Sequence, residues 1–373
     1  MAATQGSVRD AHRRRLVAVY AATVLAIAGV AGCSQDDTGE QSAQGVVVNL
    51  GGEIAVLKRI DAKPEIVGPR PDGTEKLDTY RLTAPRQLSS GDIVGIRDGG
   101  IVAISPDDPS KATLLGQATA WFPGVDNGKV WAVTEQSVAA CEGQELPTTV
   151  RAKYSAAEHE TSGHPARRVI SMPCGIEPVG QTRQGIVAHQ TTGDVTGSGN
   201  AARARTSVVL LDQNGAVSAV VAEGATVLAA DADQIVWRAD ECATGACIKI
   251  YDVQARKSRN APTCEAGDPV GSGTIAPGGR WYASAVRTDH GTHLGVLDLD
   301  EDSCQDLGAF TALDKTADLD ESLAAAWSQA NLLMIDQATG ELIEYNAITG
   351  HVERRREALS VTNGAQVWGA HNA

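Results

Sequence analysis

The chain has 373 residues and a formal net charge of -14, so it is long enough for one large repeat array or two ordinary domains. A surface this acidic repels phosphate backbones and anionic lipid headgroups. Nucleic acid is therefore not a predicted partner, and electrostatic attraction to a membrane surface is excluded as a binding mode.

Residues 1–32 have the charged and apolar regions of a secretory signal peptide. Four arginines precede an apolar run over residues 16–32, which is short for a bilayer span of about 20 residues. The run ends in the sequence VAGC, with the cysteine at position 33, and this resembles the bacterial lipobox. The resemblance implies that Cys33 carries a diacylglycerol, that the chain is cut before it, and that its new terminus can be acylated further, for example with palmitate.

Two or more acyl chains hold a protein stably on a bilayer. Cleavage before Cys33 would remove four arginines and one aspartate and change the formal charge from -14 to -17. Contact with the membrane is then expected through the lipid, on the extracytoplasmic side. The alternative is an uncleaved apolar helix that merely ends at Cys33. Residues 33–45 contain the lipidated cysteine followed by small and polar residues, which predicts a flexible tether.

The remainder, residues 46–373, shows no second linker and is predicted to be one domain of repeats. Short apolar segments recur around Trp131, Trp237, Trp281, Trp327 and Trp368. The last four are separated by 44, 46 and 41 residues. Weaker copies lie around Val47, Val94 and Val187. Repeats of about 40 to 50 residues are typical of propeller blades.

A second motif follows most of these segments: an apolar strand that ends in Asp or Asn and a turn, as in SVVLLDQNGAV, IKIYDVQARK and LLMIDQATG. Asn214-Gly215 is a strong hairpin signal. Long stretches of helical periodicity are missing, and the alanine-rich segment 324–330 aligns with strand positions. The sequence predicts paired antiparallel strands throughout.

These motifs resemble bacterial propellers of the TolB-like and quinoprotein-like kind, and the whole chain resembles exported propeller lipoproteins of high-GC Gram-positive bacteria. The resemblance implies an all-β propeller and carries no catalytic residues across. Eight repeat anchors bound seven intervals, so seven blades are predicted, with six or eight as alternatives. Ring closure is expected to pair a strand near 46–50 with one near 366–369. The tryptophans, one per blade on the same strand, are predicted to pack between blades.

Six cysteines follow Cys33, an even number that suggests disulfides in an exported chain. Six cysteines allow 15 pairings, and the sequence does not choose among them. We favour pairs close in sequence, namely Cys242–Cys247, Cys141–Cys174 and Cys264–Cys304. The alternative is a zinc site, which four residues between Cys242 and Cys247 fit poorly.

Histidines and acidic residues offer few catalytic or metal-binding patterns. His159 and His164 form H-E-x-x-x-H rather than H-E-x-x-H, and nearby Gly and Pro predict a loop. His290 and His293, with Asp289 beside them, are expected in a solvated turn. The acidic run 298–306 lacks the Gly and Glu of an EF-hand and is predicted to be a hairpin turn, although a weak cation site shared with another blade stays open.

Nucleophile and phosphate-binding motifs are equally weak. No G-x-S-x-G occurs, and the segment GVDNGKV before Trp131 lacks the spacing and hydroxyl of a phosphate loop. The glycine-rich segment 267–280 is predicted to link two blades. No catalytic residue, metal or cofactor is predicted, while a Ser-His-Asp group assembled from distant blades stays open.

Three functions follow. The first is a non-catalytic, lipid-anchored binding or scaffold module that recognises an envelope protein, peptide or glycan, through the channel or through insertions at 142–168 and 190–206. The second is a propeller enzyme, a lyase, hydrolase or quinone-dependent dehydrogenase, although no Cys-Cys dipeptide supports the last. His, Asp and Arg converging in the channel would favour an enzyme. The third is a solute-binding lipoprotein, which would require two α/β lobes.

Overall fold

The computed structural model describes residues 45–68, 81–136, 141, 152–193, 204–241, 247–262, 264, 269–288, 291–309, 325–336, 339–362 and 365–370. All the elements with described bounds in these ranges are β-strands. No helix in this part of the chain is long and apolar enough to cross a membrane. The predicted signal peptide, Cys33 and tether residues up to 44 lie outside the described residues.

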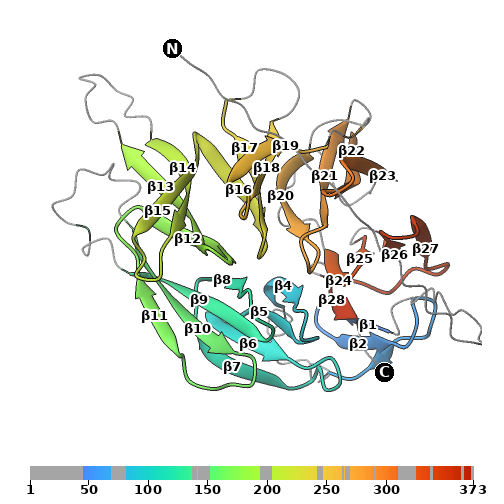
Figure 1. Cartoon of the computed structure of the whole chain (residues 1–373). Coiled ribbons are helices and arrows are strands. Elements are labelled where there is room, and N and C mark those ends of the chain that lie inside the picture. The colour runs from blue at the N-terminus through green and yellow to red at the C-terminus, as the bar shows by residue number, and fades with distance from the viewer. Residues whose placement is uncertain are drawn as a thin grey trace, which may run out of the picture. The chain divides into compact units, whose positions relative to one another are not determined.

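Seven four-stranded antiparallel sheets stand in a ring around a central axis, as Figure 1 shows. The chain is therefore a seven-bladed β-propeller, and the predicted fold class is confirmed. Blade 1 is formed by both ends of the domain, β28 and β1–β3. Blades 2 to 7 each use four consecutive strands, from β4–β7 to β24–β27.

The strands fall into four sets according to their position in the blade. The innermost strands are β28 (Gln366–Ala370), β4 (Thr83–Gln87), β8 (Ala120–Pro123), β12 (Ile176–Thr182), β16 (Ala225–Ala230), β20 (Pro269–Ile275) and β24 (Ala325–Ser328). The second strands are β1 (Val46–Asn49), β5 (Ile93–Arg97), β9 (Lys129–Gln136), β13 (Gly185–Gly193), β17 (Gln234–Ala239), β21 (Trp281–Thr288) and β25 (Asn331–Ile335). The third strands are β2 (Ile54–Leu57), β6 (Gly100–Ile104), β10 (Lys153–Glu160), β14 (Ala204–Leu211), β18 (Ile248–Asp252), β22 (Gly291–Asp298) and β26 (Leu342–Asn346). The outermost strands are β3 (Glu65–Ile66), β7 (Ala112–Gln117), β11 (Arg168–Ser171), β15 (Val217–Glu223), β19 (Lys257–Asn260), β23 (Ser303–Ala309) and β27 (His351–Arg354).

Burial explains the composition of the strands. The middle strands β1, β2, β6 and β25 are buried at every position because a neighbouring blade covers each face of their sheet. They accordingly read as continuous apolar runs rather than as alternating ones. The outermost strand β19, with sequence KSRN, is exposed at every position. Hydrophobicity therefore falls from the middle of a blade to its outer edge.

The Asp and Asn residues that end many strands cap the following turns. Asp212 Oδ1 accepts hydrogen bonds from the N–H groups of Asn214 and Ala216, at 2.7 and 3.0 Å. Asn346 Oδ1 accepts two such bonds after β26, from Ile348 and Thr349. Side chains that mimic a backbone turn in this way favour hairpins. The second sequence motif is thus a turn motif, placed most often between the third and fourth strands.

Seven apolar clusters form the core, one between each pair of adjacent blades. Trp131 and Trp368 are fully buried in two of these clusters, as predicted for packing between blades. One part of that prediction is wrong. Trp131, Trp237 and Trp281 lie on second strands, whereas Trp327 and Trp368 lie on innermost strands. An indole side chain can fill the space between two adjacent blades from the second strand or from the innermost strand.

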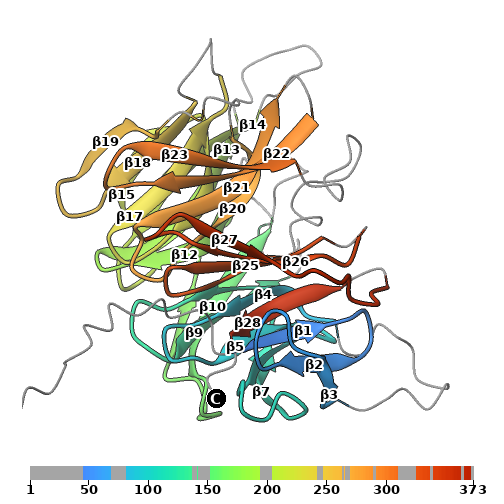
Figure 2. The same cartoon turned by 90° about the vertical axis from the view of Figure 1, so that its right-hand side faces the viewer.

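The ring closes where the sequence predicted. β28 pairs antiparallel with β1, in the register Val46↔Ala370 and Asn49↔Gln366, and the two strands lie side by side in Figures 1 and 2. The anchors Val47 and Trp368 therefore belong to one blade, which is why eight anchors give seven blades. Closure pairs both edges of β1 and leaves β28 with one unpaired edge, like the other innermost strands.

Candidate functional site

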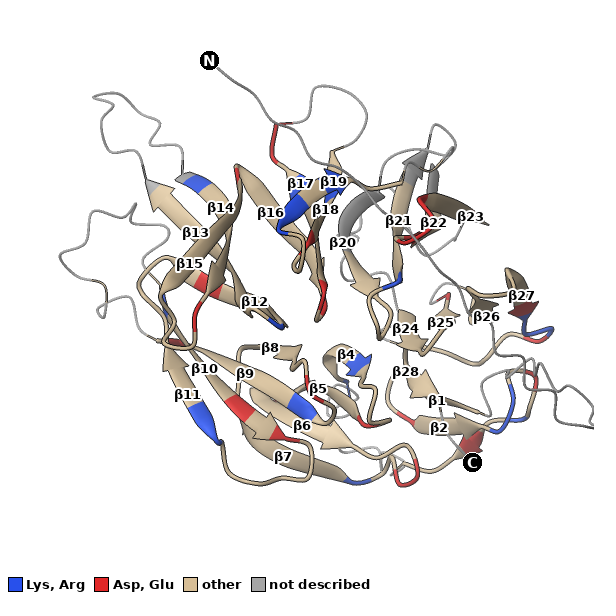
Figure 3. Cartoon of the chain, in the orientation of Figure 1, with Lys and Arg blue, Asp and Glu red and all other residues tan. Residues whose placement is uncertain are grey.

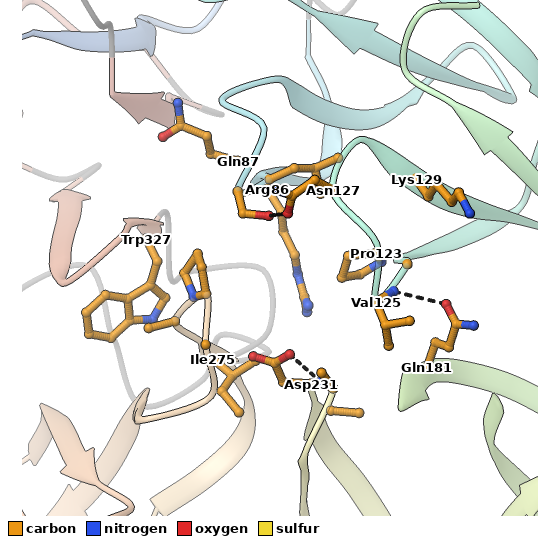
Figure 4. A pocket seen from close by; sticks show the side chains of 18 of the residues that line it. Arg86, Gln87, Pro123, Val125, Asn127, Lys129, Gln181, Asp231, Ile275 and Trp327 are labelled. Atoms are coloured by element: carbon orange, nitrogen blue, oxygen red, sulfur yellow. Dashed lines mark hydrogen bonds between the residues drawn. The ribbon is translucent and has the colours of Figure 1, made fainter. Parts of the chain in front are cut away.

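A cavity of about 300 Å³ lies on the axis of the propeller. It is bounded by β4 and by the carboxyl-terminal ends and following turns of β8, β12, β16 and β20, together with β24. Six of the seven blades therefore contribute to it. Its volume is at the lower end of the range for small-ligand sites. Figure 4 shows side chains from these separate blades pointing into one space.

Arg86 is the charged side chain that an innermost strand places in this cavity. Its guanidinium is half-buried and points toward the centre in Figure 4, and Figure 3 shows the basic segment of β4 at the middle of the ring. Within the described residues it has neither an ion pair nor a side-chain hydrogen bond. Burial lowers the pKa of Arg86 below its usual value, and the nearby Tyr282 acts in the opposite direction to a smaller extent. The group still stays protonated at neutral pH.

An irregularity in β4 sets the direction of Arg86. The pairing of β4 with β5 shifts register between Thr83 and Arg86, which is the sign of a β-bulge. Ala84, inside this bulge, has φ = 50°, in the left-handed region that L-residues seldom adopt. Bulges re-aim side chains and are frequent next to functional sites. Trp121 Nε1 donates a 3.1 Å hydrogen bond to the Ala84 carbonyl and holds the distorted backbone.

Asp231 supplies a carboxylate on the other side of the cavity, directly after β16. Its Oδ1 accepts a hydrogen bond from the Ala232 N–H, and the Gly278 N–H also donates to the carboxylate. Burial is the largest effect on this group and raises the pKa of Asp231 above its usual value, with the nearby Asp233 acting in the same direction. Through these two hydrogen bonds, Asp231 connects the turn after β16 in blade 5 to the turn after β20 in blade 6.

The remaining charged groups at the cavity are already paired. Arg183 forms an ion pair with Asp233, and Lys129 Nζ lies 2.6 Å from Asp126 Oδ2. Gln181 Oε1 accepts hydrogen bonds from Val125 N at 3.1 Å and Trp131 Nε1 at 2.9 Å. These contacts hold the cavity wall in place. Arg86 differs from them because nothing in the described chain neutralises it.

Apolar side chains complete the wall. Pro123, Val125 and Ile275 are half-buried at the cavity, and Trp327 is 3% exposed behind them. Trp327 Nε1 donates a 3.0 Å hydrogen bond to the Thr274 carbonyl. The cavity thus combines a few charged groups with an apolar surface, as ligand sites commonly do.

The predicted disulfides are present as far as the structure describes them. Cys141 bonds to Cys174, and Cys264 bonds to Cys304. Cys247 is also disulfide-bonded, and its predicted partner Cys242 lies outside the described residues. None of these cysteines lines the cavity.

The histidines differ in part from their predicted positions. His159 lies in β10 and is 7% exposed, so its predicted loop is wrong: β10 extends to Glu160, and the His159 ring packs over Gly116 of β7 in the neighbouring blade. His164 does lie in a loop, after β10, where its Nδ1 is 2.7 Å from Ser162 Oγ. His293 lies in β22 rather than in a turn, with its Nδ1 2.8 Å from Asp306 Oδ2. His290 and Asp289 are outside the described residues.

The first part of the acidic run, up to Asp302, forms the predicted hairpin turn between β22 and β23, while Asp306 lies in β23 itself. Asp298 Oδ1 accepts bonds from the N–H groups of Asp300 and Glu301, each at 3.0 Å. Arg280 pairs with Asp298 at 2.7 Å and with Glu301 at 2.6 Å. Among the described residues, no group of three or more His, Cys, Asp and Glu side chains is arranged to hold a metal.

Two further predictions need correction. The glycine-rich segment 267–280 is not only a link, because it contains β20, the innermost strand of blade 6, and its turn reaches the cavity. The predicted binding insertions at 142–168 and 190–206 are largely strand where described, in β10, β13 and β14. β9 and β13 run antiparallel to the innermost strands β8 and β12. The carboxyl ends of β9 and β13 therefore point away from the cavity.

Arg86 and Asp231 were missed in the sequence because no local motif marks them. The segment TAPRQ around Arg86 lacks apolar alternation, and its Ala-Pro pair is the one trace of the bulge. Asp231 follows the apolar segment ATVLAA like many other turn residues in this chain. Both become recognisable once the ring brings them to one cavity.

No protein-family model and no curated protein sequence matches the chain. Solved structures do resemble it. The β-propeller domain of the Trilobed protease from Pyrococcus furiosus, described as having an open velcro topology, matches with a TM-score of 0.53 and 11% identity, over 83% of this chain and 88% of that one. TolB from Acinetobacter baumannii matches with a TM-score of 0.42 and 10% identity, over 85% and 79%.

Pyrococcus horikoshii acylaminoacyl peptidase matches with a TM-score of 0.52 and 12% identity over 83% of this chain. The chain spans about half the length of that peptidase, 49%. At such identities the likeness establishes the propeller fold alone.

Proposed function

We propose that this chain is a lipid-anchored, extracytoplasmic recognition module whose propeller binds a ligand in its central cavity. The observation that carries the proposal is the cavity itself: a polar and apolar wall built by six blades, with a charged side chain inside that no described group neutralises. The lipobox-like sequence at Cys33 supports the anchor. The partner is an envelope protein, a peptide or a glycan that presents a small group to the cavity.

Binding at the cavity is tested with the full chain in detergent, by native mass spectrometry against a mixture of short peptides and oligosaccharides. Val125→Trp places a large ring at the cavity, and exposed Gln254→Leu on blade 5 serves as the matched surface control. We expect a bound species that Val125→Trp removes and Gln254→Leu retains. Ligands that bind both variants equally would place recognition elsewhere and contradict the proposal.

The anchor has its own test. A bacterial host is fed an alkyne-labelled fatty acid, and the chain is compared with Cys33→Ser. We expect label and membrane association in the parent chain and loss of both in the variant. Equal labelling of the two chains would contradict lipidation at Cys33 and leave the cavity proposal standing.

Asp231 supports a second candidate, a propeller enzyme such as a lyase or hydrolase. A carboxyl group whose pKa is raised by burial is suited to transfer protons, and Arg86 could stabilise a developing anion in the same cavity. No described histidine lines the cavity. The test is turnover: Asp231→Asn should abolish product formation while ligand binding persists. Binding without any product in the parent chain favours the recognition module.

The described strands provide no support for a solute-binding protein with two α/β lobes. All described elements are strands of one ring.

A further inference from the structure

Arg86 differs from the other charged side chains of the cavity, which are paired. Arg183, Lys129 and Asp231 each have an ion-pair or hydrogen-bond partner, while the Arg86 guanidinium forms neither kind of contact among the described residues, and the neutral phenol of Tyr282 is the group that acts on it. Guanidinium groups are seldom left half-buried and unpaired, because removing them from water is costly. A group from outside the chain would complete this pairing.

The backbone around Arg86 directs its side chain into the cavity. Ala84 is held at φ = 50° within the β4 bulge, and Pro85 follows it. Strained residues of this kind cluster at ligand-binding sites, where the surrounding structure maintains them. Gln87, the next residue after Arg86, forms two hydrogen bonds with Ala370. Its Oε1 accepts from the Ala370 N–H at 2.9 Å, and its Nε2 donates to the Ala370 carbonyl at 2.8 Å. The bulge and these two hydrogen bonds together leave the Arg86 side chain directed into the cavity.

From this arrangement we infer that the cavity is a carboxylate-binding site, with Arg86 as the anchoring residue for a small organic acid or the carboxy terminus of a peptide. The inference rests on the proposed function and specifies its ligand. A guanidinium offers two parallel N–H donors that match the two oxygens of a carboxylate. The anion would supply the missing partner.

A carboxylate fits better than a phosphate. One unpaired cation can neutralise one negative charge, whereas a phosphate dianion would retain excess charge beside Asp231, Asp233 and Asp126. The formal charge of -14 on the whole chain also repels a dianion more strongly than a monoanion. The apolar side chains of Pro123, Val125 and Ile275 would contact the organic part of the ligand. The volume of about 300 Å³ admits a small molecule or the end of a chain, not a large folded surface.

The first test needs no ligand. Arg86→Met retains the aliphatic stem and removes the unpaired charge. We expect thermal unfolding of the full chain to shift upward by about 2 °C or more, because a half-buried charge without an ion-pair partner is removed. A structural arginine would behave in the opposite way. A clear drop in the unfolding temperature of Arg86→Met would overturn the inference.

The second test uses benzoate, benzamide and inorganic phosphate as probes at equal ionic strength, with binding measured by calorimetry. We expect the parent chain to bind benzoate at least about tenfold more tightly than benzamide, since a charge-assisted pair replaces a neutral contact. Phosphate should bind more weakly than benzoate. Arg86→Met should lose the preference, and Arg86→Lys should keep only part of it because lysine lacks the two-pronged geometry.

Equal binding of benzoate and benzamide, absence of benzoate binding, or a preference that survives in Arg86→Met would each overturn the carboxylate assignment. Tighter binding of phosphate would do so as well. If neutral ligands still bind and Val125→Trp still removes them, the recognition function stands and only the ligand class fails. If Val125→Trp has no effect on any ligand, both proposals fail.

Discussion

At the residue scale, the bulge in β4 shows how local strain and position are linked. Ala84 has φ = 50°, which costs an L-residue about 1–2 kcal/mol, while glycine adopts this conformation freely at an entropic cost of about 0.5–1 kcal/mol. We therefore expect Ala84→Gly to raise the free energy of unfolding by about 0.5–1 kcal/mol. Ala157→Gly, in the regular strand β10, should lower it by about the same amount. Urea unfolding of both variants measures this, and destabilisation by Ala84→Gly would contradict it.

A buried histidine, His159, and a half-buried one, His189, make stability depend on pH. Burial lowers the pKa of His159 and of His189, and His189 Nε2 accepts a 2.9 Å bond from the Val227 N–H, which requires the neutral ring. The unfolded chain takes up protons near pH 6.5 and the folded chain does so only at lower pH, so stability present above about pH 6.5 is lost as the pH falls.

We expect His159→Leu to flatten this part of the stability profile, because the His159 Nδ1 has no hydrogen-bond partner to lose and the buried ring no longer has to be protonated. The exposed His351→Leu is the control. Thermal unfolding between pH 5 and pH 8 is the measurement. An unchanged pH dependence in His159→Leu would show that the ring is protonated equally in both states.

At the element scale, side-chain amides hold the closing strand β28 against blade 2. Gln366 Nε2 donates to the Leu82 carbonyl at 2.7 Å, and Gln366 Oε1 accepts from the Leu82 N–H at 3.3 Å. Leu82 is fully buried, so water cannot replace these bonds. Gln366→Leu should lower the free energy of unfolding by about 2–4 kcal/mol, because two buried backbone groups lose their partners.

The exposed Gln254→Leu provides the matched control and should stay within about 0.5 kcal/mol of the parent chain. Chemical denaturation followed by tryptophan fluorescence measures both variants. Similar small effects from the two substitutions would show that the amide bonds of Gln366 contribute little to holding β28.

At the scale of the whole molecule, stability depends on closing the ring. Trp368 is fully buried on β28 and packs against β1, β2 and blade 2, whereas Trp281 is half-buried on β21. Trp368→Ala should cost about 3–5 kcal/mol, since it leaves a cavity beside the joint between the two chain ends. Trp281→Ala should cost less. A smaller effect of Trp368→Ala than of Trp281→Ala, measured by urea unfolding, would contradict a central role for this joint.

Much of the architecture was predictable because it depends on local patterns that repeat. The spacing between Trp237, Trp281, Trp327 and Trp368 reports the blade length, and Asp or Asn at strand ends makes turn hydrogen bonds within a few residues. Cysteines in neighbouring strands and links could be paired for the same reason. Errors arose where local pattern does not specify position, as for Trp327 on an innermost strand and for His159 inside β10.

The sequence by itself therefore determined the class of fold and the strands that close the ring, and it favoured seven blades over six or eight, because periodic burial and turn chemistry act over short distances. Only the tertiary structure decided the site. Arg86 and Asp231 are 145 residues apart and lie on blades 2 and 5. Their approach depends on the summed rotation of successive blades and on a bulge in β4. The summed rotation is not encoded in any one segment, and the bulge leaves only an Ala-Pro pair in the sequence, so the candidate site emerges only when the ring is complete.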